Sequence, residues 1–231
     1  MKNYSLTLQS PVSDSYRCQK AANALDIDTA KKSVHKFSVD ADLDSDYSIG
    51  VIVGASGSGK TTLANNIFGD DCFKEHLDPN VPVIEQFPDE YTYDECASML
   101  GGVGLTSVPC WIRPAYTLSN GQRARAEAAL AMCSEDGIIV VDEWTSVVDR
   151  TVAKVMSHCI QKHARRQGKR IVLCSCHYDI LDWVQPDWVI DCNKQTYEDM
   201  RGPKKKGTSG LSSKSGRSAA TRGDTLASIT I

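Results

Sequence analysis

The feature that most constrains this chain is a glycine-rich loop that directly follows a short apolar run. Residues 48–53 are rich in isoleucine and valine, and residues 54–61 fit the pattern G-x-x-x-x-G-K-[ST] without departure. The run predicts a buried strand, and residues 61–68 predict a helix that ends at Gly69. This strand–loop–helix context favours a phosphate-binding loop over a flexible turn of glycine and serine.

A phosphate loop binds its ligand with backbone N–H groups, which glycines allow to point at phosphate oxygens. Lys60 is expected to reach the β- and γ-phosphates, and the Thr61 hydroxyl is expected to take a Mg²⁺ position. The N-terminal dipole of the following helix favours the anion further. The sequence therefore predicts a site for a nucleoside triphosphate, with these binding residues: Gly54, Ala55, Ser56, Gly57, Ser58, Gly59, Lys60, Thr61 and Thr62.

Two adjacent carboxylates follow a second apolar run. Residues 138–141 are all isoleucine or valine and precede Asp142 and Glu143. In a parallel sheet the carboxyl end of a strand faces the ligand crevice, so both acids are expected near the phosphates. Asp142 would help to hold Mg²⁺, and Glu143 would polarise the attacking water. A surface turn after a core strand explains the same residues, but the upstream phosphate loop favours the catalytic interpretation.

Strand and helix patterns alternate along the middle of the chain. The predicted strands are 48–53, 81–84, 137–141, 170–175 and 188–190, and the predicted helices are 61–68, 93–100, 119–133, 152–166 and 178–184. This order predicts an α/β fold with a mostly parallel sheet and helices on both faces. Residues 4–8 and 34–39 alternate in polarity and predict edge strands that flank a helical piece near 21–25.

The charge is divided between the body of the chain and its C-terminal tail. Residues 201–231 carry seven basic side chains and a single acid, Asp224, whereas the whole chain has a net charge of −3. We therefore divide the chain into an N-terminal part (1–47), an ATPase-like core (48–200) and a basic tail (201–231). The tail is rich in glycine, serine and lysine and is predicted to be disordered. A basic tail can bind nucleic acid or can simply aid solubility, and both interpretations stay open.

Membrane and secreted classes are disfavoured by the sequence. No run approaches the ~20 apolar residues that a spanning helix needs, so no integral membrane segment is predicted. The N-terminus has no apolar segment typical of a signal peptide, which favours a cytoplasmic location. The nine cysteines are scattered without a CxxC pair and are interpreted as reduced thiols.

A second anion-binding segment precedes the alanine-rich helix. Residues 118–122 read Leu-Ser-Asn-Gly-Gln, so Ser119 and Gln122 can form a capping box at the helix start. The same start presents free N–H groups to an anion, with Gly121 beside them. The segment resembles the LSGGQ signature of ATP-binding-cassette (ABC) ATPases, with Asn120 in place of one glycine.

Further motifs of that family follow in order, and the resemblance covers residues 48–191. Asp142 and Glu143 resemble its Walker B acids, and residues 146–149 resemble its D-loop, which ends at Asp149. His177, after a predicted strand, resembles the switch histidine, which implies contact with the γ-phosphate. Gln86 is similar to the Q-loop glutamine, which implies a place at the metal. The aromatic residue that stacks on adenine in this family is left open between Phe37 and Tyr47.

The resemblance also implies how the chain assembles and acts. ABC ATPases bind ATP with Mg²⁺ and pair head to tail, so Ser119 and Gly121 would serve the nucleotide of a partner copy. Residues 61–117 leave room for only a reduced helical subdomain. Residues 142–150, 176–179 and 183–189 resemble a small group of ABC-type ATPases of microbes and phages that are associated with acetyltransferase domains.

Three functions follow from these motifs. The first is a soluble ABC-type ATPase whose ATP-driven homodimer controls a partner, either nucleic acid or an acetyltransferase-like enzyme. The second is the ATP-binding subunit of a multi-chain membrane transporter. The third is a nucleotide-binding switch with negligible turnover, which the predicted catalytic residue Glu143 argues against.

Overall fold

The computed structural model describes residues 1–10, 13–25, 33–44, 46–135 and 137–202 of the chain. Its main compact unit is Met1–Arg201. The predicted tail, residues 201–231, lies outside the described residues apart from Arg201 and Gly202. All nine cysteines are free thiols. None of the helices in the described residues combines the length and the apolar character that crossing a membrane requires.

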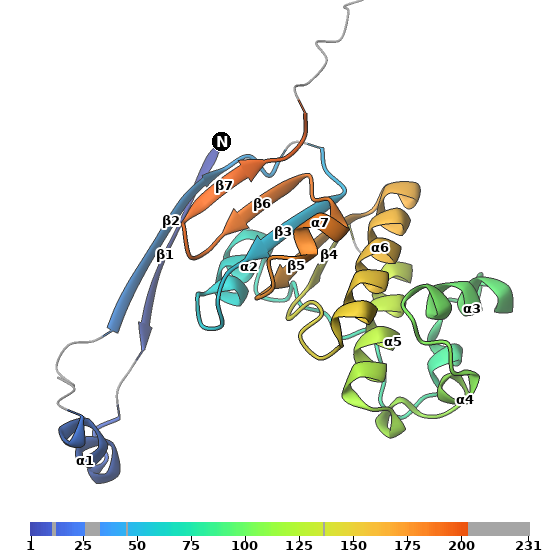
Figure 1. Ribbon diagram of the computed structural model, residues 1–231, viewed down its shortest axis with the longest axis horizontal. Helices are drawn as coiled ribbons and strands as arrows, with labels where there is room; N and C mark the ends of the chain where they lie inside the picture. Colours follow the sequence, from blue (N-terminus) through green and yellow to red (C-terminus); the bar gives the residue numbers. More distant parts are fainter. Residues whose placement is uncertain (11–12, 26–32, 45, 136, 203–231) are drawn as a thin grey trace, which may run out of the picture. The chain divides into compact units, whose positions relative to one another are not determined.

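A five-stranded sheet with the order β4-β5-β3-β6-β7 forms the centre of this unit (Figure 1). Its strands are β3 (Ile49–Val53), β4 (Ile138–Val141), β5 (Arg170–Ser175), β6 (Trp188–Asp191) and β7 (Thr196–Asp199). The first four pair in parallel, and β7 pairs antiparallel with β6. The predicted α/β fold with a mostly parallel sheet is therefore confirmed. Strand β7 was not predicted.

Alternate residues of β3 face two separate hydrophobic clusters, which shows how the sheet is covered. Ile49, Val51 and Val53 pack with α5 (Asn120–Cys133) and α6 (Arg150–Gln167) on one face. Ile52 packs on the other face with Leu63 of α2 (Lys60–Phe68). Period-2 alternation of a strand between two apolar layers is the expected pattern for a sheet that is buried on both sides. The short helix α7 (Ile180–Val184) contacts α6.

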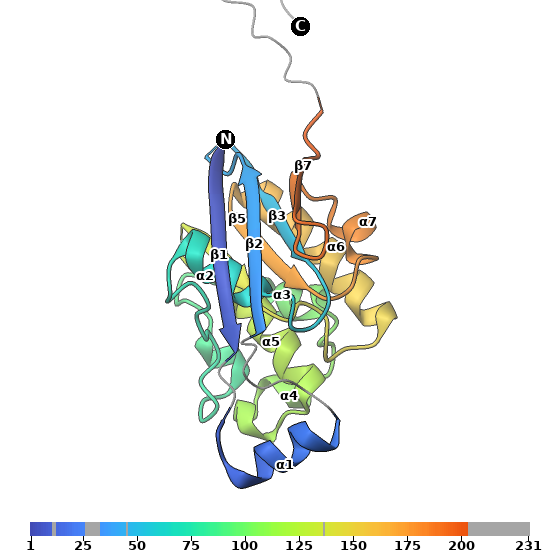
Figure 2. The same ribbon diagram turned by 90° about the vertical axis from the view of Figure 1, so that its left-hand side faces the viewer.

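The N-terminal residues form a second sheet rather than edge strands of the main one. Strands β1 (Lys2–Ser10) and β2 (Ser33–Ala41) pair antiparallel over nine residues, and Figure 2 shows them side by side. Helix α1 (Tyr16–Ala24) lies between them in the sequence. Tyr4, Phe37 and Val39 of this hairpin are buried in the same cluster as Ile52, so the hairpin helps α2 to cover its face of the sheet.

The segment between α2 and α5 contains short helical pieces. They are η1 (Val83–Gln86), α3 (Tyr93–Gly102), α4 (Val108–Trp111) and η2 (Ala115–Thr117). The prediction of a strand at residues 81–84 is wrong, because η1 begins there and the local pairing is a single bridge between Pro82 and Pro114. Proline has no N–H to donate to a ladder, which prevents a regular strand at this point.

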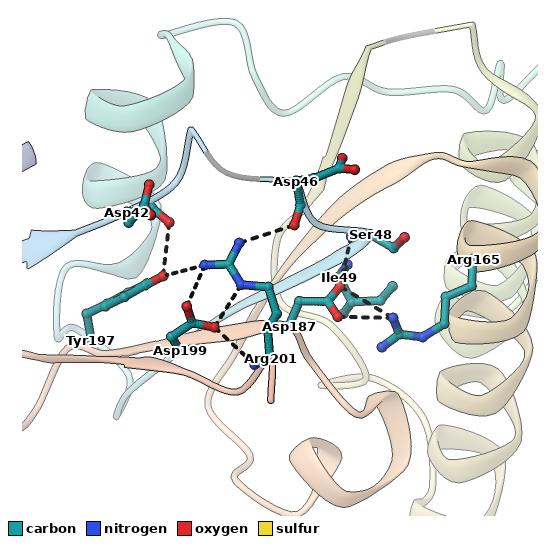
Figure 3. A network of polar contacts seen from close by, with 9 residues as sticks. All are labelled: Asp42, Asp46, Ser48, Ile49, Arg165, Asp187, Tyr197, Asp199 and Arg201. Atoms are coloured by element: carbon teal, nitrogen blue, oxygen red, sulfur yellow. Dashed lines mark hydrogen bonds and ion pairs between the residues drawn. The ribbon is translucent and has the colours of Figure 1, made fainter. Parts of the chain in front are cut away.

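A network of polar contacts holds the amino end of β3 in place (Figure 3). Asp187 Oδ2 accepts hydrogen bonds from the backbone N–H groups of Ser48 and Ile49, each at 2.8 Å. Arg165, near the end of α6, donates to Asp187 Oδ1 at 3.1 Å. One carboxylate therefore holds together the starts of β3 and β6 and the last turn of α6.

A second cluster in Figure 3 fixes the last described residues of the sheet. Arg201 donates to both carboxylate oxygens of Asp199, at 2.7 and 2.8 Å, and to the carbonyl of Asp46 at 3.1 Å. It also reaches the Tyr197 hydroxyl at 3.2 Å, which in turn donates to the carbonyl of Asp42 at 2.9 Å. These bonds join β7 to the segment that leads from β2 into β3.

Candidate functional site

The glycine-rich loop lies between β3 and α2, as the sequence predicts. Gly57 has φ 77° and Gly59 has φ 91°, which are left-handed conformations that glycine adopts without steric cost. Helix α2 begins at Lys60, directly after Gly59. Residues 55–57 are exposed, so the loop is open to solvent where a phosphate would enter.

Lys60 is buried inside this loop. Lys60 is only 4% exposed, and its side-chain ammonium donates hydrogen bonds to the carbonyl oxygens of Gly54 and Ala55, each at 3.0 Å. Neutral carbonyls satisfy hydrogen bonds of the ammonium without neutralising its charge. The loop therefore holds a positive charge at the place where the sequence predicts phosphate.

Thr61 and Asp142 meet at the carboxyl edge of the sheet. The Thr61 hydroxyl, on the first turn of α2, donates to Asp142 Oδ2 at 2.7 Å. Asp142 follows β4, so the contact joins two segments that are 81 residues apart in the sequence. A hydroxyl and a carboxylate side by side fit Mg²⁺, which prefers oxygen ligands and few protein contacts. Thr62 follows on the same turn and is exposed.

Glu143 lies in a turn with an unusual backbone. Its φ is 48° and that of Thr145 is 66°, although neither residue is glycine. The N–H of Glu143 donates to Asp142 Oδ1 at 2.8 Å, while its own side chain is exposed. Between them Trp144 is 2% exposed, and its indole donates to Ser157 of α6 at 3.0 Å. The buried tryptophan anchors a turn whose sparsely populated φ values present the carboxylate to solvent.

A cavity of about 510 Å³ borders this turn. Its walls come from residues within 73–79 and 140–148, from α5 and from Met156 of α6, and they include Glu143. Glu127 of α5 also lines it and accepts a hydrogen bond from the backbone N–H of His76 at 2.6 Å. Burial raises the pKa of the Glu127 carboxyl. Sequence reasoning missed this group, because a glutamate in an alanine-rich helix looks like an ordinary surface residue.

His177 follows β5, the neighbour of β4 in the sheet. Its backbone N–H donates to the Ser175 hydroxyl at 3.1 Å, and that hydroxyl donates to the carbonyl of Trp144 at 3.1 Å. The carbonyl of Ser175 accepts from the N–H of Gly54 at 3.3 Å. Ser175 therefore links the segment of His177, the turn of Glu143 and the start of the phosphate loop.

The signature-like segment starts α5 with the predicted capping box. The Ser119 hydroxyl accepts from the Gln122 N–H at 3.3 Å, and the Gln122 side chain accepts from the Ser119 N–H at 2.9 Å. A Cβ on Gly121 would lie 3.2 Å from the carbonyl of Val147, so this helix start packs closely on the D-loop-like segment. Asp149 caps α6 by accepting from two N–H groups at 2.9 and 3.0 Å. Because α5 and α2 cover opposite faces of the sheet, the signature segment and the phosphate loop come from different sides.

Two further interpretations of the sequence concern the metal position of Gln86 and the residue that stacks on adenine. The amide of Gln86 bonds within its own segment, to the N–H and carbonyl of Asp78 at 2.7 and 3.0 Å and to the carbonyl of Val81 at 2.8 Å. Its proposed place at the metal stays a prediction. The two candidates for stacking on adenine, Phe37 and Tyr47, are 3% and 5% exposed. Burial raises the pKa of Tyr47 to about 12, and neither ring offers an open face to a base.

Comparisons with known proteins bear on this arrangement. No protein-family model matches the chain. A curated relative from Leuconostoc mesenteroides, the energy-coupling factor transporter ATP-binding protein EcfA1, is 27% identical over an alignment of 210 positions, and the match covers 74% of this chain and 77% of the relative. The protein of the same name from Staphylococcus aureus is 26% identical over an alignment of 183 positions, and the match covers 63% of this chain and 67% of the relative.

Solved structures match the fold. A dimeric bacterial ABC transporter cassette matches with a TM-score of 0.54 and 17% identity, covering 73% of this chain and 93% of the cassette. The dimeric post-hydrolysis state of that cassette, with ADP and Pi bound, matches with a TM-score of 0.55 and 17% identity, covering 85% of this chain and all of the cassette. The fold is that of a P-loop ABC cassette.

Proposed function

We propose that this chain, which has the fold of an ABC cassette, is an ABC-type ATPase that hydrolyses ATP at the edge formed by its phosphate loop, Asp142 and Glu143. The observation that carries the proposal is the 2.7 Å bond between the Thr61 hydroxyl and Asp142. It brings the end of the phosphate loop to the carboxyl end of β4, where Glu143 is the next residue.

Each residue at this edge has a role that its position supports. Lys60 exchanges its bonds to two loop carbonyls for bonds to phosphate oxygens, which are stronger because both partners are charged. Thr61 and Asp142 hold Mg²⁺, which supplies neutralisation of the phosphate charge when bound. The exposed carboxylate of Glu143 orients and polarises a water, and His177 contacts the γ-phosphate.

We further propose an ATP-dependent head-to-tail homodimer. The capped start of α5, with Ser119 and Gly121, packs on the D-loop-like segment and lies on the other side of the sheet from α2. A second copy, placed head to tail, can then bring this helix start and Asp149 to the nucleotide of the first. Free N–H groups at a helix start favour phosphate, so the second copy completes the site. The dimeric state of the matching cassettes supports this arrangement.

The dimer is proposed to control a partner, which is nucleic acid or an acetyltransferase-like enzyme. The small size of the helical segment between α2 and α5 and the resemblance of residues 142–150 support this function. The printed names of the curated relatives favour a second candidate, a subunit of a membrane transporter. Val108, Ile112 and Tyr116 expose apolar side chains just before the signature segment, and such side chains can contact a protein partner of either kind.

The Glu143→Gln variant tests the catalytic proposal. We expect kcat for ATP to fall by about 100-fold or more, because loss of a general base typically costs that much. Glu198→Gln, which changes an exposed acid of β7, is the matched control and should keep the wild-type rate. Equal rates for wild type and Glu143→Gln would favour a nucleotide switch with negligible turnover.

The same variant tests the dimer and its partner. Light scattering of Glu143→Gln should show a dimer with ATP and a monomer with ADP, and a monomer under both conditions would contradict the head-to-tail site. Stimulation of wild-type hydrolysis by DNA or RNA would favour the nucleic-acid partner. Capture of an acetyltransferase by the ATP-trapped variant would favour the enzyme partner, and co-purification with a membrane protein would favour the transporter.

A further inference from the structure

The side chain of Arg150 joins three segments near the proposed catalytic edge. Arg150 is the first residue of α6, directly after the Asp149 cap. Its Nε donates to Asp179 Oδ2 at 3.0 Å and its Nη2 donates to the other carboxylate oxygen, so the ion pair is bidentate. Its Nη1 lies 3.5 Å from the Thr145 hydroxyl, and its guanidinium lies 4.9 Å from the centroid of the Trp183 ring.

These contacts reach both loops that carry the proposed catalytic residues. Thr145 lies two residues after Glu143 and is the second residue with positive φ in that turn. Asp179 lies two residues after His177. A turn with two such φ values persists only when surrounding contacts hold it, and Arg150 supplies one of them.

The position of the pair suggests an effect on geometry rather than on stability. The side chains of Arg150 and Asp179 are 39% and 48% exposed, and ion pairs with that much exposure contribute little to the free energy of unfolding. A planar guanidinium bonded to both carboxylate oxygens does fix the relative orientation of the two groups. The hydrogen bond from Arg150 lowers the pKa of the Asp179 carboxyl, so the carboxylate is charged at neutral pH.

A second, buried connection joins the same two loops. The Ser175 hydroxyl ties the backbone of His177 to the carbonyl of Trp144, inside the molecule. The Arg150–Asp179 pair ties the same loops at the surface. The Ser175 hydroxyl and the backbone bond from the Trp144 N–H to the carbonyl of Cys174, at 2.8 Å, hold the segment before His177, and the Arg150–Asp179 pair holds the segment after it.

We infer that Arg150 and Asp179 are positioning residues that hold Glu143 and His177 in one geometry for ATP hydrolysis. The inference rests on the proposed function. Neither residue needs to touch the nucleotide. Misplacement of reacting groups by a fraction of an ångström slows the chemical step more than it weakens binding, so the pair should act on kcat.

A double-mutant cycle tests the inference. We expect Arg150→Ala and Asp179→Ala each to lower kcat about tenfold, with KM for ATP within about twofold of wild type. The double variant should be no slower than either single variant, because both remove the same interaction. Arg150→Lys should recover only part of the rate, since lysine cannot bond both oxygens in one plane.

The chain offers a matched control at the other end of the same helix. Arg165 also pairs with an aspartate, Asp187, but near the amino end of β3. Arg165→Ala should keep the wild-type kcat. Additive losses in the cycle, a loss in KM alone, or an equal loss of kcat in Arg165→Ala would overturn the inference.

Hydrogen exchange separates this inference from the proposed function. Without nucleotide, the backbone amides of residues 142–150 and 175–180 should exchange faster in Arg150→Ala than in wild type, and should be unchanged in Arg165→Ala. If wild type and Glu143→Gln hydrolyse ATP equally slowly, the proposed function fails. The exchange rates of these amides in Arg150→Ala then still decide whether the Arg150–Asp179 pair holds the two loops. Rates equal to those of wild type would refute the inference.

Discussion

The two edges of the parallel sheet are built for different purposes. At the amino edge, one carboxylate, Asp187, saturates the N–H groups of Ser48 and Ile49 and pairs with Arg165. At the carboxyl edge, Glu143 is exposed in a backbone conformation with positive φ, and the Lys60 ammonium bonds only to neutral carbonyls among the described contacts. At the first edge the Asp187 carboxylate is paired with hydrogen-bond donors from three residues, which favours stability. The second keeps charged groups ready for a ligand, which favours function at a cost in stability.

The largest expected effect is on nucleotide affinity at the carboxyl edge. Lys60→Met keeps the apolar stem of the side chain but removes its charge, and charged hydrogen bonds contribute about 1.5–3 kcal/mol. We expect ATP with Mg²⁺ to bind about 10–100-fold more weakly in calorimetric titration, with little change in Tm. A large fall in Tm with unchanged affinity would show that the comparison between the edges is wrong.

A smaller effect is expected at the amino edge. Asp187→Ala leaves two backbone N–H groups without their acceptor, which should lower the free energy of unfolding by about 2 kcal/mol. For a chain of this size that corresponds to a Tm about 4–8 °C lower in thermal denaturation. ATP affinity should stay at the wild-type value. Asp182→Ala, which removes an exposed acid of α7, is the control and should leave Tm unchanged.

The smallest effect concerns His163, which lies in α6 between the two edges. Burial lowers the pKa of its imidazole, whose Nε2 lies 3.1 Å from the carbonyl of Met132. The imidazole therefore takes up a proton near pH 6.5 in the unfolded chain, but only at a lower pH in the folded chain. The contribution of His163 to the free energy of unfolding is complete above pH 6.5 and is lost as the pH falls below it. Between about pH 7.5 and 5.5, the Tm of wild type should fall by about 1–2 °C more than that of His163→Gln. An equal fall in both proteins would exclude His163 as the cause.

The residues of the carboxyl edge could be predicted from the sequence because their signals are local. The apolar run before Gly54, the helix after Lys60 and the capping box of Ser119 each depend on neighbours within a few residues. The pairing of Thr61 with Asp142 followed from the parallel sheet, since carboxyl ends of parallel strands share one edge.

Features that depend on distant partners could not be predicted in this way. Strand β7 is short and mostly exposed, and it is defined by pairing with β6 rather than by an apolar pattern. The hairpin of β1 and β2 has the alternation of edge strands, and only the pairing of all the strands shows that it forms a separate sheet. Glu127 meets its hydrogen-bond donor 51 residues away in the sequence, so its burial left no local signal. The bidentate pair of Arg150 and Asp179 spans 29 residues and was invisible for the same reason.

The hydrogen bonds of Ser175 limit which side chains can replace it. Its hydroxyl must donate to one carbonyl and accept from one N–H at the same time, and its own carbonyl receives the first N–H of the phosphate loop. Alanine supplies neither bond, and cysteine supplies both only weakly. Threonine keeps the hydroxyl but adds a methyl group at a position with no exposed surface. The hydroxyl thus joins two loops that are far apart in the sequence, and a substitution of this one side chain would be felt by both, whereas the backbone bond to the phosphate loop would remain.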